Sequence, residues 1–293
     1  MASLKTVKNK IVGVQKTKQI TKAMYMVSSA KLRGAQGRIE RFRPFADKFQ
    51  AMLNDLAAKA DSSAHKLLEF RAEKKTCGII LVTSDRGLCG GFNVNLISAA
   101  LKLAKEKQAA GMAVKFYNVG KKGRDAIRKM GYEQPAMGQT TLDPLSYTVA
   151  GKLGEDIIGD YLAGNLDEVH MVFAHFVSIG RQVVTLQPML PIAAETSEAK
   201  DGGEGQELEY VYEPDVVTLL AVLLPRYIKA QIYRGLLDTS ASEQAARMSA
   251  MDNATRNCDE IAASLTLLYN KTRQSAITTD LIDIVSGANA LNG

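Results

Sequence analysis

The chain has 293 residues, of which 46% are hydrophobic and 23% charged, and its formal net charge is +6. This length allows one large or two small domains with a sizeable core, and the composition is typical of a globular protein. No window approaches the roughly 18 apolar residues of a membrane span, and the N-terminus lacks the apolar stretch of a secretory signal.

The positive charge is concentrated at the N-terminus. Residues 1–50 hold twelve Lys or Arg and two acids, a net +10, which leaves −4 on the other 243 residues. Such an arm is typical of a protein with an anionic partner, although a solvated helix face has the same composition.

The three cysteines, Cys77, Cys89 and Cys258, match no metal or disulfide spacing, which suits a reducing compartment.

Residues 1–58 are predicted to form a long helix. The stretch is rich in helix-forming Lys, Ala, Met and Gln, and Ser3 can cap its start. Pro44 is expected to kink or interrupt it. Apolar residues follow the 3-4-3 spacing of a coiled-coil seam, and the register then shifts. The seam positions are Leu4, Val7, Ile11 and Val14, followed after the shift by Ile20, Met24 and Val27.

Residues 76–192 alternate between strand and helix patterns. Strands are predicted at 76–84, 113–120, 167–178 and 181–191, and helices at 93–108, 122–131 and 145–162. The last two strands form a predicted hairpin, and His170 and His175 should lie on opposite faces of the first of them. This order predicts an α/β sheet with mixed strand directions.

The C-terminal part of the chain is predicted to be a second long helix. Residues 193–215 form an acidic, glycine-bearing link, and the helical pattern then covers residues 216–288. Its seam positions are Met251, Ala254, Cys258, Ile261, Leu265, Leu268 and Thr272. The two terminal helices can bury their seams against each other, so we expect a long antiparallel coiled coil beside the α/β domain.

The loop after the first strand, TSDRGLCGG, contains the glycines that a phosphate-binding loop needs. It lacks the G-x-G-x-x-G spacing of dinucleotide folds and the G-K-[ST] end of a P-loop, and no Lys lies within it. A tight strand-to-helix turn is therefore favoured over a nucleotide site. No catalytic triad, carboxylate pair or metal cluster stands out in the sequence.

Four stretches resemble the gamma subunits of rotary proton-translocating ATP synthases. They are IVGVQKTKQITKAMYMVSSAKL (11–32), TSDRGLCGGFN (83–93), the segments YEPD, RYIKAQIYRG and SEQAARMSAM between residues 212 and 251, and YNKTRQSAITTDLIDIVSGANA (269–290). Together they extend over nearly the whole chain. Asp280 departs from the family, which usually has Glu there, but the charge is kept.

The resemblance implies both a fold and a function. The terminal helices would form a coiled coil inside the alternating alpha/beta hexamer, with a Rossmann-like α/β domain at the foot beside the epsilon subunit and the c-subunit ring. The chain would be the central rotor shaft, one copy per complex, coupling proton-driven rotation of the ring to ATP synthesis or hydrolysis. The resemblance implies no catalytic residue, cofactor, metal or nucleic acid for this chain. It implies a peripheral location on the cytoplasmic side of a bacterial inner membrane.

The resemblance also implies contact residues. Those expected to face the beta subunits are Met24, Arg86, Cys89, Arg273 and Gln274, with Arg86 as a charge partner of an acidic beta loop and Cys89 as a bystander at that surface. Those expected near epsilon and the c ring are Arg41, Pro44, Tyr210 and Glu213. The chain has no cysteine between Cys89 and Cys258, so the thiol regulation of photosynthetic members is not expected.

Two other classes stay open on the residues alone. One is a coiled-coil nucleic-acid binder that uses the basic arm, and a steep salt dependence of DNA binding would indicate it. The other is a nucleotide-dependent enzyme built on the α/β domain, which binding of ATP or NAD by the isolated chain would indicate.

Overall fold

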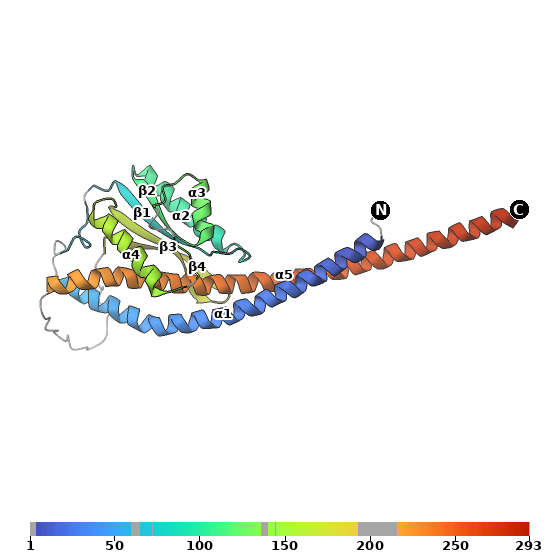
Figure 1. Cartoon of the computed structure of the whole chain (residues 1–293), viewed down its shortest axis with the longest axis horizontal. Coiled ribbons are helices and arrows are strands. Elements are labelled where there is room, and N and C mark those ends of the chain that lie inside the picture. Colours follow the sequence, from blue (N-terminus) through green and yellow to red (C-terminus); the bar gives the residue numbers. More distant parts are fainter. Residues whose placement is uncertain are drawn as a thin grey trace, which may run out of the picture. The chain divides into compact units, whose positions relative to one another are not determined.

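The structure is a computed structural model that describes residues 4–59, 65–71, 73–135, 140–143, 145–192 and 216–292. By its contacts the chain divides into two compact units, Met1–Ser29 with Arg247–Gly293, and Ala30–Ala246. Helices α1 (Leu4–Lys59) and α5 (Val216–Asn292) contribute to both units (Figure 1). The four-part division expected from the sequence stays a prediction.

The first unit pairs the start of α1 with the last part of α5. Lys18 forms an ion pair with Asp259, and the hydroxyls of Thr21 and Thr255 lie 2.7 Å apart. Residue numbers therefore rise along α1 as they fall along α5, which makes the two helices antiparallel. The expected antiparallel pairing of the terminal helices is confirmed.

The seam of α1 runs without a shift in register, so the predicted move to Ile20 and Val27 is wrong, while Met24 is half-buried beside the seam residue Tyr25. Ile20 and Val27 are 61% and 58% exposed. Three polar residues, Lys18, Thr21 and Ser28, occupy seam positions and interrupt the apolar pattern. The buried or half-buried positions keep an unbroken 3-4 alternation at Leu4, Val7, Ile11, Val14, Lys18, Thr21, Tyr25, Ser28, Leu32, Ala35 and Ile39.

The predicted seam of α5 is displaced by one residue over part of its length. Ile261 and Leu268 are 49% and 48% exposed, whereas Ala262 and Tyr269 are half-buried. The contact of Thr255 with Thr21 fixes which face of α5 meets α1, and that polar contact is invisible in an apolar pattern.

Helix α1 continues through Pro44, so the predicted interruption does not occur. A proline inside a helix removes one hydrogen bond and costs about 3 kcal/mol. Aromatic contacts on either side hold this part of α1 against α5: Phe42 meets Tyr233 edge-on at 5.0 Å, and Phe49 meets Tyr227 at 5.9 Å.

The second unit contains a four-stranded sheet in the order β2-β1-β3-β4. The strands are β1 (Thr76–Val82), β2 (Ala113–Val119), β3 (Glu168–Ser178) and β4 (Arg181–Leu190). β1 is parallel to both β2 and β3, and β3 and β4 form an antiparallel hairpin. The predicted mixed α/β sheet is confirmed.

The sheet is covered on both faces (Figure 1). One face packs on α2 (Phe92–Ala109) and α3 (Lys121–Lys129), and its core includes Ile79, Leu81 and Phe116. The other face packs on α4 (Tyr147–Leu162), α5 and α1, and its core includes Ile80 and Val82. His170 and His175 have separate partners, Glu168 and Asp238, as expected for opposite faces of β3.

Helix α5 is long and apolar enough, by length and composition, to cross a membrane. The sequence pattern alone predicts no such stretch, because charged residues interrupt the apolar residues of this helix. This is only weak evidence for a membrane-spanning helix, because core helices of soluble proteins share these properties. In this chain, 33% of the most apolar 18-residue stretch is buried.

Candidate functional site

The loop after β1 is held together by its own polar groups. The Asn93 side chain accepts a hydrogen bond from the backbone N–H of Ser84 (3.0 Å) and donates to the Ser84 hydroxyl (2.8 Å). The same side chain donates to the Cys89 sulfur at 3.2 Å. Ser84 is fully buried, and its hydroxyl also donates to the Arg86 carbonyl at 2.5 Å. The glycine-rich stretch is therefore a braced turn rather than an open cradle.

Asp85 fastens this loop to its neighbours. Its carboxylate accepts hydrogen bonds of 3.0 Å from the backbone N–H of Lys121, the first residue of α3, and of Leu142 and Asp143. A carboxylate thus already occupies the start of α3, where a phosphate would otherwise be favoured, and it would repel a phosphate. This arrangement supports the strand-to-helix turn over the nucleotide site.

The loop presents Arg86 and Leu88 outward and Cys89 inward. Leu88 is 64% exposed and has a φ of +62°, which is unusual for a residue other than glycine. Cys89 is 3% exposed, so its expected place at the surface is corrected: the bond from Asn93 turns the thiol into the core. Sequence reasoning missed Leu88, which lies beside Arg86 on the outer side of the turn.

The other expected contact residues lie on the two long helices. Met24 is half-buried on α1, and Arg273 and Gln274 are exposed on α5. Arg41 and Pro44 are exposed on α1, and Arg41 Nε donates to the Gly37 carbonyl at 2.9 Å. Tyr210 and Glu213 lie outside the described residues.

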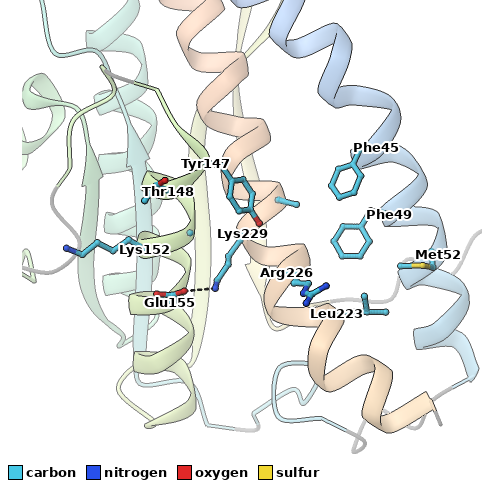
Figure 2. Close-up of a pocket in the computed structure, with 12 residues that line it drawn as sticks. Phe45, Phe49, Met52, Tyr147, Thr148, Lys152, Glu155, Leu223, Arg226 and Lys229 are labelled. Carbon is cyan, nitrogen blue, oxygen red and sulfur yellow. Dashed lines mark hydrogen bonds and ion pairs between the residues drawn. The ribbon is translucent and has the colours of Figure 1, made fainter. Parts of the chain in front are cut away.

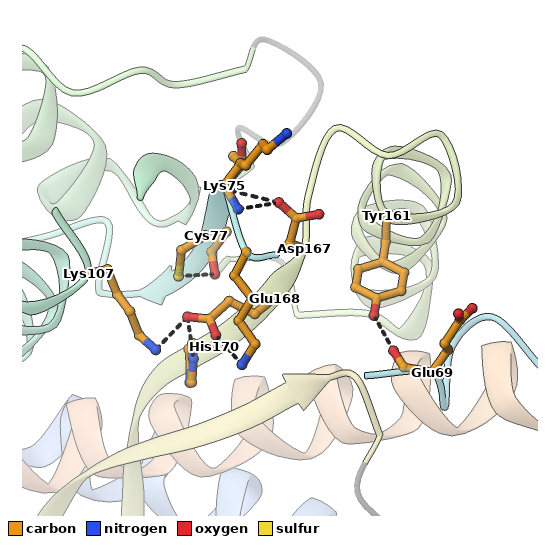
Figure 3. A network of polar contacts seen from close by, with 11 residues as sticks. Glu69, Lys75, Cys77, Lys107, Tyr161, Asp167, Glu168 and His170 are labelled. Carbon is orange, nitrogen blue, oxygen red and sulfur yellow. Dashed lines mark hydrogen bonds and ion pairs between the residues drawn. The ribbon is translucent and has the colours of Figure 1, made fainter. Parts of the chain in front are cut away.

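A polar network at the start of β1 and β3 was missed from the sequence (Figure 3). Glu168 is 3% exposed, and its carboxylate binds Lys107 Nζ at 2.5 Å, Lys74 Nζ at 3.1 Å and His170 Nε2 at 3.3 Å. Beside it, Asp167 accepts hydrogen bonds from the backbone of Lys75 (2.7 Å) and Thr76 (2.9 Å). The sequence does contain a signal for this network: the adjacent acids Asp167 and Glu168 stand at the start of β3, and the adjacent Lys74 and Lys75 precede the neighbouring strand β1.

The charges in the network shift the pKa values of its members. Burial alone would raise the pKa of Glu168, but hydrogen bonds from Lys107 and Lys74 lower it to about 2. Burial lowers the pKa of His170, and burial together with Glu168 raises the pKa of Cys77 to about 12. Glu168 is therefore ionised, and Cys77 a protonated thiol, at neutral pH.

Cys77, Glu168 and His170 have ligand atoms within 4.8 Å of one another, a set that could hold a metal ion. Both carboxylate oxygens of Glu168 are already bonded to ammonium groups, which would repel a cation. The geometry therefore favours an ion-pair network over a metal centre.

A groove of about 890 Å³ lies between α1, α4 and α5 (Figure 2). Phe45, Phe49 and Met52 from α1 line one side of it, and α4 contributes Tyr147 and Glu155. An ion pair of 2.8 Å between Lys229 and Glu155 crosses from α5 to α4. The groove is mainly apolar with a charged rim, and the one acid among the described residues that line it, Glu155, is paired with Lys229.

Comparisons with known proteins agree with these features. A family model described as ATP synthase matches residues 3–291. The ATP synthase gamma chain of Nitratidesulfovibrio vulgaris (strain Hildenborough) is 63% identical over 293 residues, with 100% of both chains covered. The gamma chain of Maridesulfovibrio salexigens is 59% identical over the same length, again with 100% of both covered.

Solved structures give the same result. A chain of the central stalk and c-ring of the Tetrahymena thermophila mitochondrial ATP synthase is 26% identical and has a TM-score of 0.59, with 80% of this chain and 99% of that chain covered. A chain from the Euglena gracilis mitochondrial ATP synthase shares the fold, with a TM-score of 0.67 at 20% identity over 98% of this chain and 94% of that one. The chain belongs to the ATP synthase gamma chain family, the non-catalytic central-stalk subunits of a membrane-associated complex.

Proposed function

We propose that this chain is the rotor shaft that couples proton-driven rotation of a c-subunit ring to ATP synthesis or hydrolysis in an alpha/beta hexamer. The observation that carries the proposal is the match to ATP synthase gamma chains over the full length of the chain. The antiparallel pairing of α1 and α5 supports it, because two helices packed along a seam resist twisting better than one.

The exposed end of α5 supports a partner that covers it. Every described side chain from Ile277 to Asn289 is exposed, and Leu281, Ile284 and Val285 are 56%, 68% and 56% exposed. The register that joins Lys18 to Asp259 brings the start of α1 opposite residues near 273, so α1 does not extend along this segment. An exposed apolar helix indicates a binding surface, and the proposed occupant is the inside of the alpha/beta hexamer.

The beta contacts are proposed on the exposed residues. The proposed contacts are Arg86 and Leu88 at the turn after β1, and Arg273 and Gln274 on α5, and the exposure of these four side chains supports the proposal. Met24 is also proposed as a beta contact, and its side chain is half-buried on α1. Exposed ion pairs are worth about 0–1 kcal/mol each, so contacts of this kind can be exchanged as a shaft turns.

The epsilon subunit and the c ring are proposed at the foot, near Arg41 and Pro44. The proposed location is peripheral, on the cytoplasmic side of the cell inner membrane.

The test is ATP hydrolysis by a matched alpha/beta preparation with and without this chain, followed by single-molecule rotation. All three cysteines are buried, so a filament should be attached through Ile179→Cys, on the exposed β3–β4 turn. We expect the chain to raise turnover and the filament to rotate in steps of a third of a turn. Unchanged hydrolysis, with no assembly of the chain into the hexamer, would contradict the proposal.

A further inference from the structure

Helix α5 passes from one face of the sheet to the other beside β3. At Gly235 it touches the face of Met171 and Phe173 so closely that a Cβ would overlap the Met171 methyl group. Eleven residues later, Ala246 packs on the cluster of the opposite face, which contains Val172 and Ala174. The segment Gly235–Ala246 therefore crosses the edge of β3.

The crossing occurs where β3 loses its neighbouring strand. Pairing between β1 and β3 ends at Leu81 and Val172, so β1 provides no partner for the backbone of Ala174. Alternate residues of a strand direct their backbone groups to the same edge, so Ala174 faces the edge that β1 occupies at Val172. A buried N–H and C=O at this point need partners from another element.

Two hydroxyls of α5 supply these partners. The Ala174 N–H donates to Thr239 Oγ1 at 3.3 Å, and the Ser242 hydroxyl donates to the Ala174 carbonyl at 3.1 Å. Thr239 and Ser242 are both fully buried. Side chains of the helix thus continue the hydrogen bonding of the sheet for one residue beyond the end of β1.

A buried acid completes the attachment. Asp238 is 2% exposed, and its carboxylate lies 2.9 Å from His175 Nδ1, on the residue after Ala174. Arg234 and Arg43 lie close enough to act on its charge. Asp238, Thr239 and Ser242 occupy one short stretch of α5, and all three bind residues 174 and 175 of β3.

We propose that Asp238, Thr239 and Ser242 form the joint that transmits torque between the α/β domain and helix α5. The inference rests on the proposed shaft function. Apolar contacts permit one surface to slide over another, because dispersion and burial have little directional preference. Hydrogen bonds are directional, and breaking buried ones leaves their groups unsatisfied, so these three residues resist sliding and turning of α5 against the sheet.

The test uses the complete proton-translocating enzyme assembled with this chain in lipid vesicles. Thr239→Val with Ser242→Ala removes both hydroxyls at nearly constant volume. The matched control, Thr185→Val with Ser240→Ala, makes the same chemical changes in the same unit, at residues with no bond to Ala174 among the described contacts. Thr239→Ser with Ser242→Thr keeps both hydroxyls.

The double substitution Thr239→Val with Ser242→Ala is called the joint variant. We expect the soluble complex of alpha, beta and this chain to hydrolyse ATP at the wild-type rate when it contains the joint variant. ATP synthesis driven by a proton gradient should fall about fivefold or more, which is the lower end of the typical range for coupling between distant sites. The control variant and the variant that keeps both hydroxyls should synthesise ATP at the wild-type rate. A filament on Ile179→Cys should also show a wider angular spread in the joint variant.

Three results would overturn the joint: unchanged synthesis, an equal loss of synthesis and hydrolysis, or the same loss in the control variant. Failure of the wild-type chain to stimulate hydrolysis would instead contradict the shaft function itself. If the joint variant does not assemble, ATP synthesis and the angular spread of the filament should be measured with Thr239→Val alone. An angular spread equal to that of the wild-type chain would then contradict the proposed joint.

Discussion

Glu168 shows how a charged residue is kept inside this domain. Its carboxylate is almost fully buried, which is costly for an unpaired charge, yet both of its oxygens accept hydrogen bonds from ammonium groups. The lysines come from different parts of the chain, Lys74 before β1 and Lys107 near the end of α2. The network therefore joins three segments where the two central strands, β1 and β3, begin.

The pKa of Glu168 makes a prediction for stability. It falls from an ordinary 4.5 to about 2, so the stabilisation should be present above pH 4.5 and be lost as the pH falls towards 2. Glu168→Gln should reduce the free energy of unfolding by about 3 kcal/mol at pH 7, and by much less near pH 3. Urea unfolding of the full chain at several pH values measures both. The control is Glu73→Gln, whose exposed pair with Lys75 should contribute less than about 1 kcal/mol.

The cysteines give a second prediction at this scale. Cys77, Cys89 and Cys258 are 0%, 3% and 8% exposed, and a thiol reagent needs an accessible thiolate. The folded chain should therefore react slowly with a maleimide, and all three thiols should react once guanidinium unfolds it. Ile179→Cys is the positive control and should be labelled at once in the folded chain. Fast labelling of Cys89 in the native protein would show that the turn after β1 is open.

The turn after β1 also shows where sequence reasoning stops at single residues. The glycines and the flanking strand and helix patterns predict a tight turn, and the structure contains one. The direction of each side chain depends on Asn93, which lies on α2 and bonds both Ser84 and Cys89. No periodicity contains that information, so Cys89 was expected at the surface while Leu88 was overlooked.

At the level of elements, the positions of strands and helices follow closely from the sequence. β1 to β4 begin and end within two residues of their predicted bounds, because buried strands between turn residues give a strong local signal. The seams of the long helices were harder to predict. Lys18 and Thr21 are seam residues because they bind Asp259 and Thr255, which are more than 230 positions away in the chain.

Two glycines on either side of β2, Gly111 in the turn before it and Gly120 in the turn after it, yield a prediction. Gly120 has a φ of +100°, and a Cβ there would overlap the Thr83 carbonyl, whereas Gly111 has a φ of +84° and open space around it. Gly111→Ala should cost only the strain of the left-handed backbone, about 1–2 kcal/mol. Gly120→Ala should cost clearly more, or prevent folding, because backbone atoms must also move. Thermal unfolding of both variants measures the difference, and equal costs would show that the turn can relax.

At the scale of the whole molecule, the fold class and the family could be predicted because long helical patterns and four matching stretches extend over the chain. The contacts that fasten α5 to β3 could not be predicted. They join residues that are 63 to 68 positions apart, and Asp238, Thr239 and Ser242 look like ordinary polar residues of an amphipathic helix. Only the end of β1 pairing at Leu81 explains why hydroxyls are needed there.

The antiparallel pair of helices leads to a prediction about the assembled enzyme. The hydroxyls of Thr21 and Thr255 are 2.7 Å apart, so Thr21→Cys with Thr255→Cys places two thiols at one layer of the seam. Oxidation should join α1 to α5 within a single shaft. Since both helices turn together in the proposed rotor, hydrolysis by the alpha/beta/chain complex should stay near the wild-type rate after oxidation and after reduction.

The control for this experiment is a cross-link between the shaft and a beta subunit, which does not rotate with it. A cross-link between Leu88→Cys, on the exposed turn after β1, and a cysteine on the facing beta subunit should stop turnover until it is reduced. Rotation predicts opposite outcomes for the two links, because one lies within the moving body and the other crosses its boundary. If the internal link also stopped hydrolysis reversibly, α1 and α5 would have to move against each other during the cycle, and the rigid-shaft mechanism would be wrong for this chain.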